Sequence, residues 1–358
     1  MPRARSIRPT LCPDHELSIL TTRTESVRTS HPAAGAWQQA MKTAVRDPIQ
    51  LCRLLDLPTQ YESGAAAAAR QFSVFAPLEF IRRMRPGDPQ DPLLRQVLPL
   101  DAELQQVSGF SQDAVQDAAA TVGPGLIHKY AGRALMVTTG VCAAHCRYCF
   151  RRHFPYAELP SRDNAWQALV TSIQEDESIE EVILSGGDPL TIDDAQLEEL
   201  VTRLSEIKHV RRLRVHTRLP VLIPQRVTAA LVAWLRGTRL VPVVVVHINH
   251  PAEIDDAVSD ALARLVDAGI PTLNQAVLLR GVNDNEEALV DLCRMLADRR
   301  VLPYYLHQLD RVEGAAHFEV PVRAGLQLID RMRARLPGYA VPRYVQDVPG
   351  DAGKRVLA

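Results

Sequence analysis

The sequence predicts an α/β fold, a partial TIM-like barrel of six βα units with a helical N-terminal extension. Short apolar runs rich in β-branched residues alternate with helical segments from residue 133 onward, at a spacing close to 30 residues after the first unit. Chemically distinctive residues follow the ends of these runs, where parallel α/β folds place their sites. The spacing alone fits a doubly wound sheet equally well, so the placement of these residues is what favours the barrel.

Six runs are expected to form the parallel strands of the core, which is predicted to span residues 128–340. The first unit is longer than the others because a loop with three cysteines is inserted after its strand. Runs of this kind suit parallel strands, because β-branched residues pack well on a pleated, buried surface. The predicted strands are residues 133–140, 180–187, 211–218, 241–249, 272–279 and 302–309.

The region 36–127 precedes the core and is expected to be helical and to pack on it. Residues 36–57 indicate a helix, a break at Pro48 and a second amphipathic helix. The alanine run at 65–69 favours helix as well. Residues 84–127 are rich in Pro, Asp and Gly, which is typical of a connecting segment.

The two ends of the chain differ from this pattern. Residues 1–35 contain several arginines and no apolar run, so we expect a disordered extension and no secretory signal. Residues 341–358 form a separate C-terminal segment that carries Lys354.

Composition excludes some classes of partner. The formal net charge is -1, from 41 basic and 42 acidic residues, so no overall field attracts nucleic acid or an anionic membrane. The longest apolar stretch, 240–246, is far shorter than the roughly 20 residues that span a bilayer. Recognition must therefore come from a local site.

Half of the six cysteines lie in one short loop, as Cys142, Cys146 and Cys149. Such a cluster in a chain of 358 residues indicates metal ligation in a reducing compartment, the cytoplasm, and no disulfide framework. The spacing C-x-x-x-C-x-x-C suits an iron-sulfur cluster held by thiolates. Three cysteines on a cubane of four irons leave one iron open, and that iron can bind the amino and carboxylate groups of S-adenosylmethionine (SAM). A structural zinc site, with His153 as fourth ligand, is the alternative.

The loop that ends in Tyr148-Cys149-Phe150 resembles the cluster motif of the radical SAM superfamily, and so implies a [4Fe-4S] cluster and SAM. One βα unit later, Gly186-Gly187-Asp188 is similar to the superfamily's glycine-rich segment that receives the SAM amino group. Glycines there are expected to leave backbone groups at the strand edge free for a ligand.

The stretch DVPGDAGK, which contains Lys354, resembles the pyridoxal 5'-phosphate (PLP) loop of lysine 2,3-aminomutases. Segments such as HKYAGRALMVTTGVC, LSGGDPL, HINHPAEI and LPYYLHQLD match the same family from residue 85 to residue 354. The resemblance implies that Lys354 is the catalytic residue that binds PLP covalently, and that Lys129 and Arg133 hold its phosphate. Gln275, His247 and Asn249 are expected at the same mouth, the first two as cofactor contacts.

Substrate contacts follow from the same resemblance. Arg151 occupies the position of the arginine that clamps the substrate carboxylate, which suits a planar bidentate donor. Asp310 and Asp347 match the two acids that hold the distal ammonium of lysine. Paired carboxylates beside a PLP lysine are also what a diamino acid requires, although either aspartate could instead cap a loop.

The implied reaction is a 1,2-amino shift that converts L-lysine to (R)-β-lysine. A radical derived from SAM removes hydrogen from the β-carbon, and PLP carries the migrating nitrogen. An electron donor such as flavodoxin or ferredoxin is implied.

The signatures FRRHFPYAE, HINH, PYYLHQLD and GAAHF resemble the shorter branch of this family, the elongation factor P β-lysylation proteins. The free-lysine branch has zinc-binding cysteines in a C-terminal tail and a further cysteine in the GVND segment. This chain has Asn285 at the latter position and stops soon after Lys354. The shorter branch implies functional partners, namely elongation factor P and its ligase, and leaves a homo-oligomer open.

Two other functions remain open at this point. One is a free-lysine or other amino acid aminomutase, although the two aspartates disfavour an acidic substrate such as glutamate. The other is an inactive scaffold that binds a cluster without chemistry. The intact cysteines and Lys354 argue against the scaffold.

Overall fold

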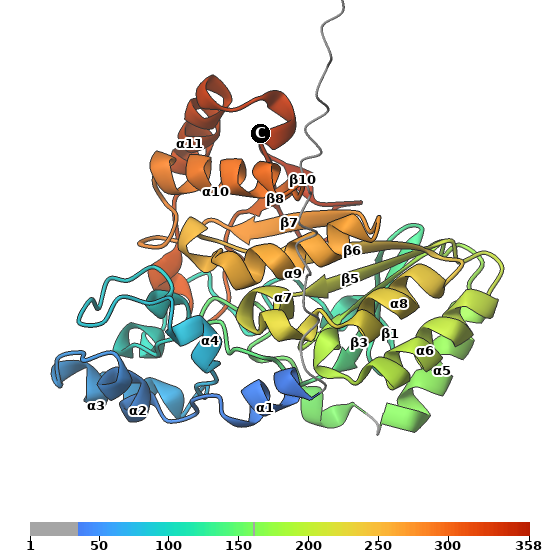
Figure 1. Ribbon diagram of the computed structural model, residues 1–358, viewed down its shortest axis with the longest axis horizontal. Coiled ribbons are helices and arrows are strands. Elements are labelled where there is room, and N and C mark those ends of the chain that lie inside the picture. The colour runs from blue at the N-terminus through green and yellow to red at the C-terminus, as the bar shows by residue number, and fades with distance from the viewer. Residues whose placement is uncertain (1–34, 160–161) are drawn as a thin grey trace, which may run out of the picture. The chain divides into compact units, whose positions relative to one another are not determined.

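The computed structural model describes residues 35–159 and 162–358, and shows a curved sheet with helices packed around it (Figure 1). The sheet has 10 strands, and their order in space is their order in the chain, from β1 to β10. Neighbours in sequence are therefore neighbours in space, as a succession of βα units requires. The described strands β1 and β10 end the sheet without pairing to each other, so it is an open sheet and a partial barrel.

The six predicted parallel strands are present, each within two residues of its expected ends. Each pairs with the next in parallel register. They are β3 (Arg133–Thr139), β4 (Glu181–Gly186), β5 (Arg212–Thr217), β6 (Val241–His247), β7 (Thr272–Val277) and β8 (Leu302–His307).

The prediction missed four short strands at the two ends of the sheet. β9 (Arg343–Gln346) lies parallel to β8, so the C-terminal segment continues the sheet. The others pair antiparallel: β1 with β2, β2 with β3, and β10 with β9. Their bounds are β1 (Thr121–Gly123), β2 (Leu126–Tyr130) and β10 (Arg355–Val356).

Strand β9 is anchored from both sides. Gln308 N donates to Val345 O at 2.7 Å, which joins β9 to the end of β8. The buried Tyr344 hydroxyl donates to the side-chain oxygen of Gln308. It also packs against Gly325, where an added Cβ would lie 2.2 Å from the Tyr344 oxygen. The strand that leads to Lys354 is therefore fixed in the sheet.

The parallel strands are connected by helices, and α10 and α11 lie side by side at the top of Figure 1. Side-chain caps begin several of these helices. Asp255 accepts a hydrogen bond from Val258 N at 2.8 Å, and Asn285 accepts one from Ala288 N at 2.9 Å. The helices are α5 (Arg162–Glu175), α6 (Asp194–Glu206), α7 (Leu219–Leu222), α8 (Ala229–Gly237), α9 (Asp256–Asp267), α10 (Glu286–Asp298) and α11 (Val322–Arg335).

The N-terminal region contains short α-helices and packs against the core. Pro48 is the first residue of α2, which confirms the predicted break. Arg83 crosses to the core and donates to the backbone carbonyls of Val221, at 2.5 Å, and Glu253. The helices are α1 (Ala36–Lys42), α2 (Pro48–Leu54), α3 (Gln60–Ala69) and α4 (Leu78–Ile81). The predicted extension over 1–35 falls outside the described residues, except for residue 35.

Side chains on the parallel strands alternate between the outer helices and the inside of the curve. On β5, Leu213 and Val215 are buried in the hydrophobic core, whereas Arg214 and His216 line an internal cavity. In the described part of the chain no helix is both long and apolar enough to cross a membrane. The cysteines in that part are all free, as a chain without a disulfide framework requires.

Candidate active site

A cavity of about 540 Å³ lies inside the curved sheet, toward the C-terminal ends of the parallel strands. Its size is in the range of ligand pockets. All fourteen residues predicted to hold cofactors, metal or substrate line this one cavity: Lys129, Arg133, Cys142, Cys146, Cys149, Arg151, Gly186, Gly187, Asp188, His247, Gln275, Asp310, Asp347 and Lys354. Asn249 does not line it. It is buried behind the wall and donates to Tyr148 Oη at 2.7 Å.

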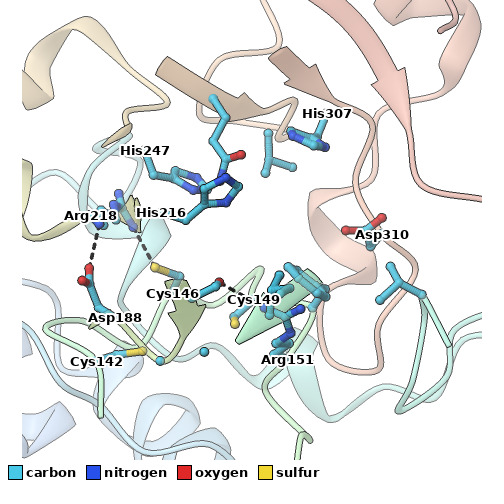
Figure 2. A pocket seen from close by; sticks show the side chains of 18 of the residues that line it. Cys142, Cys146, Cys149, Arg151, Asp188, His216, Arg218, His247, His307 and Asp310 are labelled. Atoms are coloured by element: carbon cyan, nitrogen blue, oxygen red, sulfur yellow. Dashed lines mark hydrogen bonds between the residues drawn. The ribbon is translucent and has the colours of Figure 1, made fainter. Parts of the chain in front are cut away.

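The cysteine loop follows β3 and brings three thiols to one side of the cavity (Figure 2). Burial, followed by the negative charge of Cys146, raises the pKa of Cys149 to about 11. Burial also raises the pKa of Cys142 well above its ordinary value. Without metal these two thiols are therefore protonated at neutral pH, and iron binding would displace their protons.

The thiols fit a polynuclear cluster better than a single ion. Among the described residues, no three His, Cys, Asp or Glu side chains converge as ligands of one metal ion. His153, the predicted fourth ligand of a zinc site, instead places its Nε2 3.3 Å from Glu313 O. A cubane needs thiolates spread over its corners, and three cysteines on one short loop suit it.

One of the three sulfurs is held by an arginine. Arg218 follows β5, and its Nη1 donates to Cys146 Sγ at 2.8 Å. Its Nη2 donates to Glu253 Oε2 at 2.9 Å, and Gln96 accepts from the same nitrogen. The ion pair is buried. The carboxylate neutralises the guanidinium, so the arginine can remain buried beside the sulfur.

The glycine segment lies against the start of the cysteine loop. Gly186 has φ +122, and a Cβ there would lie 2.7 Å from Thr139 O. At Gly187 a Cβ would lie 2.2 Å from Val141 O. The glycines are needed for this close approach, and their predicted role toward the SAM amino group stays a prediction. The backbone N–H of Gly187 is not free for a ligand, because it donates to Thr139 O at 2.7 Å.

Asp188 joins two strand ends. Its buried carboxylate accepts hydrogen bonds from Leu190 N at 3.0 Å, Thr217 Oγ1 at 2.7 Å, Arg218 N at 2.7 Å and Leu219 N at 3.1 Å. Burial raises its pKa, and these donors counter that effect. The side chain therefore fixes the turn after β5 and so positions Arg218.

Lys354 lines the same cavity and lies in an ion pair. Its Nζ donates to Asp347 Oδ2 at 2.8 Å. Lys129 Nζ lies 3.3 Å from the other oxygen of Asp347 and 3.6 Å from an oxygen of Asp117. Burial raises the pKa of Asp347, but Lys354 and Lys129 outweigh burial and lower it overall. Lys129 is thus paired with two acids, and its assignment to a phosphate stays a prediction.

Asp310 faces the same space without a partner. No hydrogen bond or ion pair to its carboxylate occurs among the described residues. Burial, partly offset by the charge of Lys354, raises its pKa to about 7. A cation placed beside it would restore the ionised form.

Arg151 is buried just past the last cysteine. Its Nε donates to Asp117 Oδ2 at 2.8 Å, and its Nη1 donates to Ser185 Oγ at 3.3 Å. The sequence did not single out Asp117, because QDAAAT carries no motif and lies 34 residues from Arg151. Arg151 Nη2 has no protein partner in the described part of the chain, and Arg151 lines the cavity.

Three other predicted site residues line the cavity, and they differ in their contacts with the rest of the protein. Arg133 stacks over the Tyr130 ring, with its guanidinium carbon 4.8 Å from the centroid. His247 Nε2 lies 3.3 Å from Tyr148 Oη, and burial lowers its pKa to about 3. Gln275 lies on β7 and lines the cavity.

The chain has sequence similarity to known proteins. Residues 136–293 match the Radical SAM superfamily. The proteins named L-lysine 2,3-aminomutase from Haemophilus influenzae and Escherichia coli are 43% and 42% identical to this chain, over 90% and 91% of it and 95% of each relative. A protein of the same name from Clostridium subterminale is 34% identical, over 89% of this chain and 76% of the relative.

Proposed function

Because this chain belongs to the lysine 2,3-aminomutase family of radical SAM enzymes, we propose that it converts L-α-lysine to (R)-β-lysine, with PLP bound to Lys354. Membership of the family makes the chain an isomerase of the lysine 2,3-aminomutase type that uses a [4Fe-4S] cluster and SAM. The dependence on PLP, the product and its later use are the proposal.

The observation that carries the proposal is the sharing of one cavity by two sets of residues. The three thiols line it, and so do Lys354, Asp347 and Asp310. When bound, the cluster and SAM supply a radical, and PLP carries the amino group through the shift. A reaction that needs both cofactors at one carbon chain requires such an enclosed, shared space.

The charges of the cavity suit lysine. Asp347 and Asp310 are two buried acids that can hold one distal ammonium, and Arg151 has a free Nη2 for a carboxylate. A glutamate side chain would instead add a negative charge beside these aspartates, at a cost in free energy. The remaining expected contacts, Lys129 and Arg133 to the phosphate and Gln275 and His247 to the cofactors, belong to the same proposal.

We further propose that the product serves the β-lysylation of elongation factor P by a separate ligase, in the cytoplasm. Asn285 supports this branch, since its side chain caps α10 where the resemblance places a cysteine in the free-lysine branch. An electron donor such as flavodoxin or ferredoxin is part of the proposal. Free-lysine metabolism is the second candidate, because the relatives are named as lysine aminomutases only.

The activity is tested with anaerobically reconstituted protein, SAM, PLP and a reductant. L-Lysine is expected to become β-lysine, and the K354A variant is expected to lose both turnover and the visible absorbance of bound PLP. Lysine that stays unchanged with a full cluster and bound PLP would exclude the proposal.

The pathway is tested separately. The product is supplied to elongation factor P and its ligase, and intact protein mass is measured. One added lysyl unit that depends on this enzyme supports the pathway, and no change relative to α-lysine alone favours free-lysine metabolism.

A further inference from the structure

Two imidazole rings inside the cavity each have a ring nitrogen without a hydrogen-bond partner among the described residues. His216 lies near the end of β5, and His307 is the last residue of β8. Both side chains line the cavity. In each ring Nε2 is buried and has no hydrogen-bond partner among the described residues. A buried polar nitrogen without a partner carries a free-energy cost, so it calls for a ligand or an ordered water.

These two rings lie close to Lys354. Its charge contributes to the low pKa of each, after burial; His247 lowers the pKa of both rings further, and His216 also lowers that of His307. Figure 2 shows His216 and His307 among the side chains around the same space. A group attached to the end of Lys354 would therefore come within reach of these two rings.

Two other histidines show what is specific to this pair. His247 is in the same cavity, but its Nε2 faces Tyr148 Oη at 3.3 Å. His317 has both ring nitrogens buried and unpartnered, but it does not line the cavity. Among the described histidines, only His216 and His307 both line the cavity near Lys354 and have an unpartnered ring nitrogen.

The charge state of the pair limits what it can bind. Burial lowers the pKa of both rings well below the ordinary value, and nearby Arg214 lowers that of His216 further. Both rings are therefore neutral at physiological pH, each with one N–H donor and one acceptor nitrogen. Such groups suit the uncharged polar atoms of an aromatic ring, and they suit a phosphate less well than Arg133 does.

We propose that His216 and His307 are contacts of the PLP ring, each with one hydrogen bond from or to Nε2. This inference rests on the proposed function, because PLP must be joined to Lys354 for the rings to reach it. Joining condenses the lysine amine with the PLP aldehyde, which forms one C=N bond and releases one water. Neutral imidazoles hold the ring in place and add no charge to the cavity.

PLP binding to the full-length protein without SAM tests the inference. The visible absorbance of protein-bound PLP is titrated for wild type and for H216F and H307F, each of which removes the hydrogen-bonding nitrogen. Each variant is expected to bind PLP roughly tenfold more weakly, as for one lost hydrogen bond in a buried site. H317F is the matched control and is expected to bind as wild type does, because His317 also has buried, unpartnered ring nitrogens but lies outside the cavity.

Two further measurements distinguish a lost contact with PLP from misfolding and from a site that holds only water. H216Q and H307Q keep a polar group and should regain part of the affinity. A crystal structure of PLP-loaded wild type should place a PLP atom within hydrogen-bond distance of both Nε2 atoms. Variants that bind PLP like wild type, or a structure with only water at both nitrogens, overturn the inference.

The outcomes separate this inference from the proposed function. Wild type that forms no covalent link with PLP contradicts the proposed function. Wild type that binds PLP, with H216F and H307F unaffected, contradicts only the role of the histidines. Loss of SAM binding with intact PLP binding in these variants also overturns it, since the rings would then serve the other cofactor.

Discussion

Lys354 Nζ lies 2.8 Å from Asp347 Oδ2, so the lysine proposed to carry PLP neutralises the acid proposed to bind the substrate ammonium. The side chain of Lys354 ends in the same butylammonium group as free lysine. Without PLP, the protein thus fills its own ammonium site. Joining PLP to Lys354 replaces that ammonium by an imine and so frees Asp347.

We predict that a substrate analogue binds only after PLP. The analogue 6-aminohexanoate has the carboxylate and distal ammonium of lysine but no α-amino group, so it cannot join PLP through an α-nitrogen as the substrate does. Calorimetry is expected to give at least about tenfold weaker binding to PLP-free wild type than to PLP-loaded wild type. PLP-free K354A should bind it better than PLP-free wild type, because Asp347 is then unoccupied. Equal affinity with and without PLP would contradict this order.

Asp310 predicts a pH dependence of the same binding. Its pKa is raised to about 7, first by burial, so below that pH it is mostly neutral and must lose a proton to pair with an ammonium. Affinity for 6-aminohexanoate in PLP-loaded protein should therefore rise from about pH 6 to about pH 8, steeply below pH 7 and weakly above it, approaching tenfold per pH unit at the acid end.

Two variants check the origin of that slope. D310N should bind the analogue more weakly and without the slope, whereas D267N, at an exposed ion pair with Arg300, should keep it. Binding that is constant over this pH range in wild type would show that Asp310 does not accept the ammonium.

The hydrogen bond from Arg218 predicts an effect on the reduction potential of the cluster. Reduction adds a negative charge to the cluster, and a cationic N–H donor at Cys146 Sγ, 2.8 Å away, stabilises the reduced form. R218Q should therefore shift the midpoint potential to a more negative value, measured by EPR-monitored titration at equal iron content. R226Q is the control, because Arg226 is as buried but pairs with Asp194 outside the cavity. An unshifted potential in R218Q would refute the role of this hydrogen bond.

Gly187 predicts a steric effect on the cysteine loop. In G187A the new methyl group would meet Val141 O at 2.2 Å, so the backbone next to Cys142 must move. Iron bound per chain after reconstitution should fall well below the wild-type value. G237A changes a glycine with open space around it and should bind iron normally. A full complement of iron in G187A would show that the loop adapts freely.

The sequence predicted best what depends on local pattern. Valine-rich runs such as Val241–His247 appear as strands because β-branched residues at this spacing have few alternatives in a chain of βα units. The cysteine loop and Lys354 could be singled out as candidate site residues because their motifs are short and contiguous. β9 was missed since its four residues are too few for a periodicity.

The contacts between distant segments could not be predicted. Asp117 reaches Arg151, and Arg218 reaches Cys146, through tertiary packing that leaves no pattern in either segment. The glycines were recognised, but their steric role was not, because the close approach of Gly187 to Val141 is a property of two neighbouring loops. His307 was read only as part of a strand, since alternation does not reveal which inward side chains lack a partner.

The pairing of β9 with β8 has a consequence for the order in which the site matures. The thiols of Cys142, Cys146 and Cys149 are synthesised with the first parallel strand, but Asp347 and Lys354 arrive with the last. During synthesis on the ribosome, the cysteine loop therefore exists before the lysine that we propose to bind PLP. The proposed PLP site becomes complete only when β9 has joined the sheet.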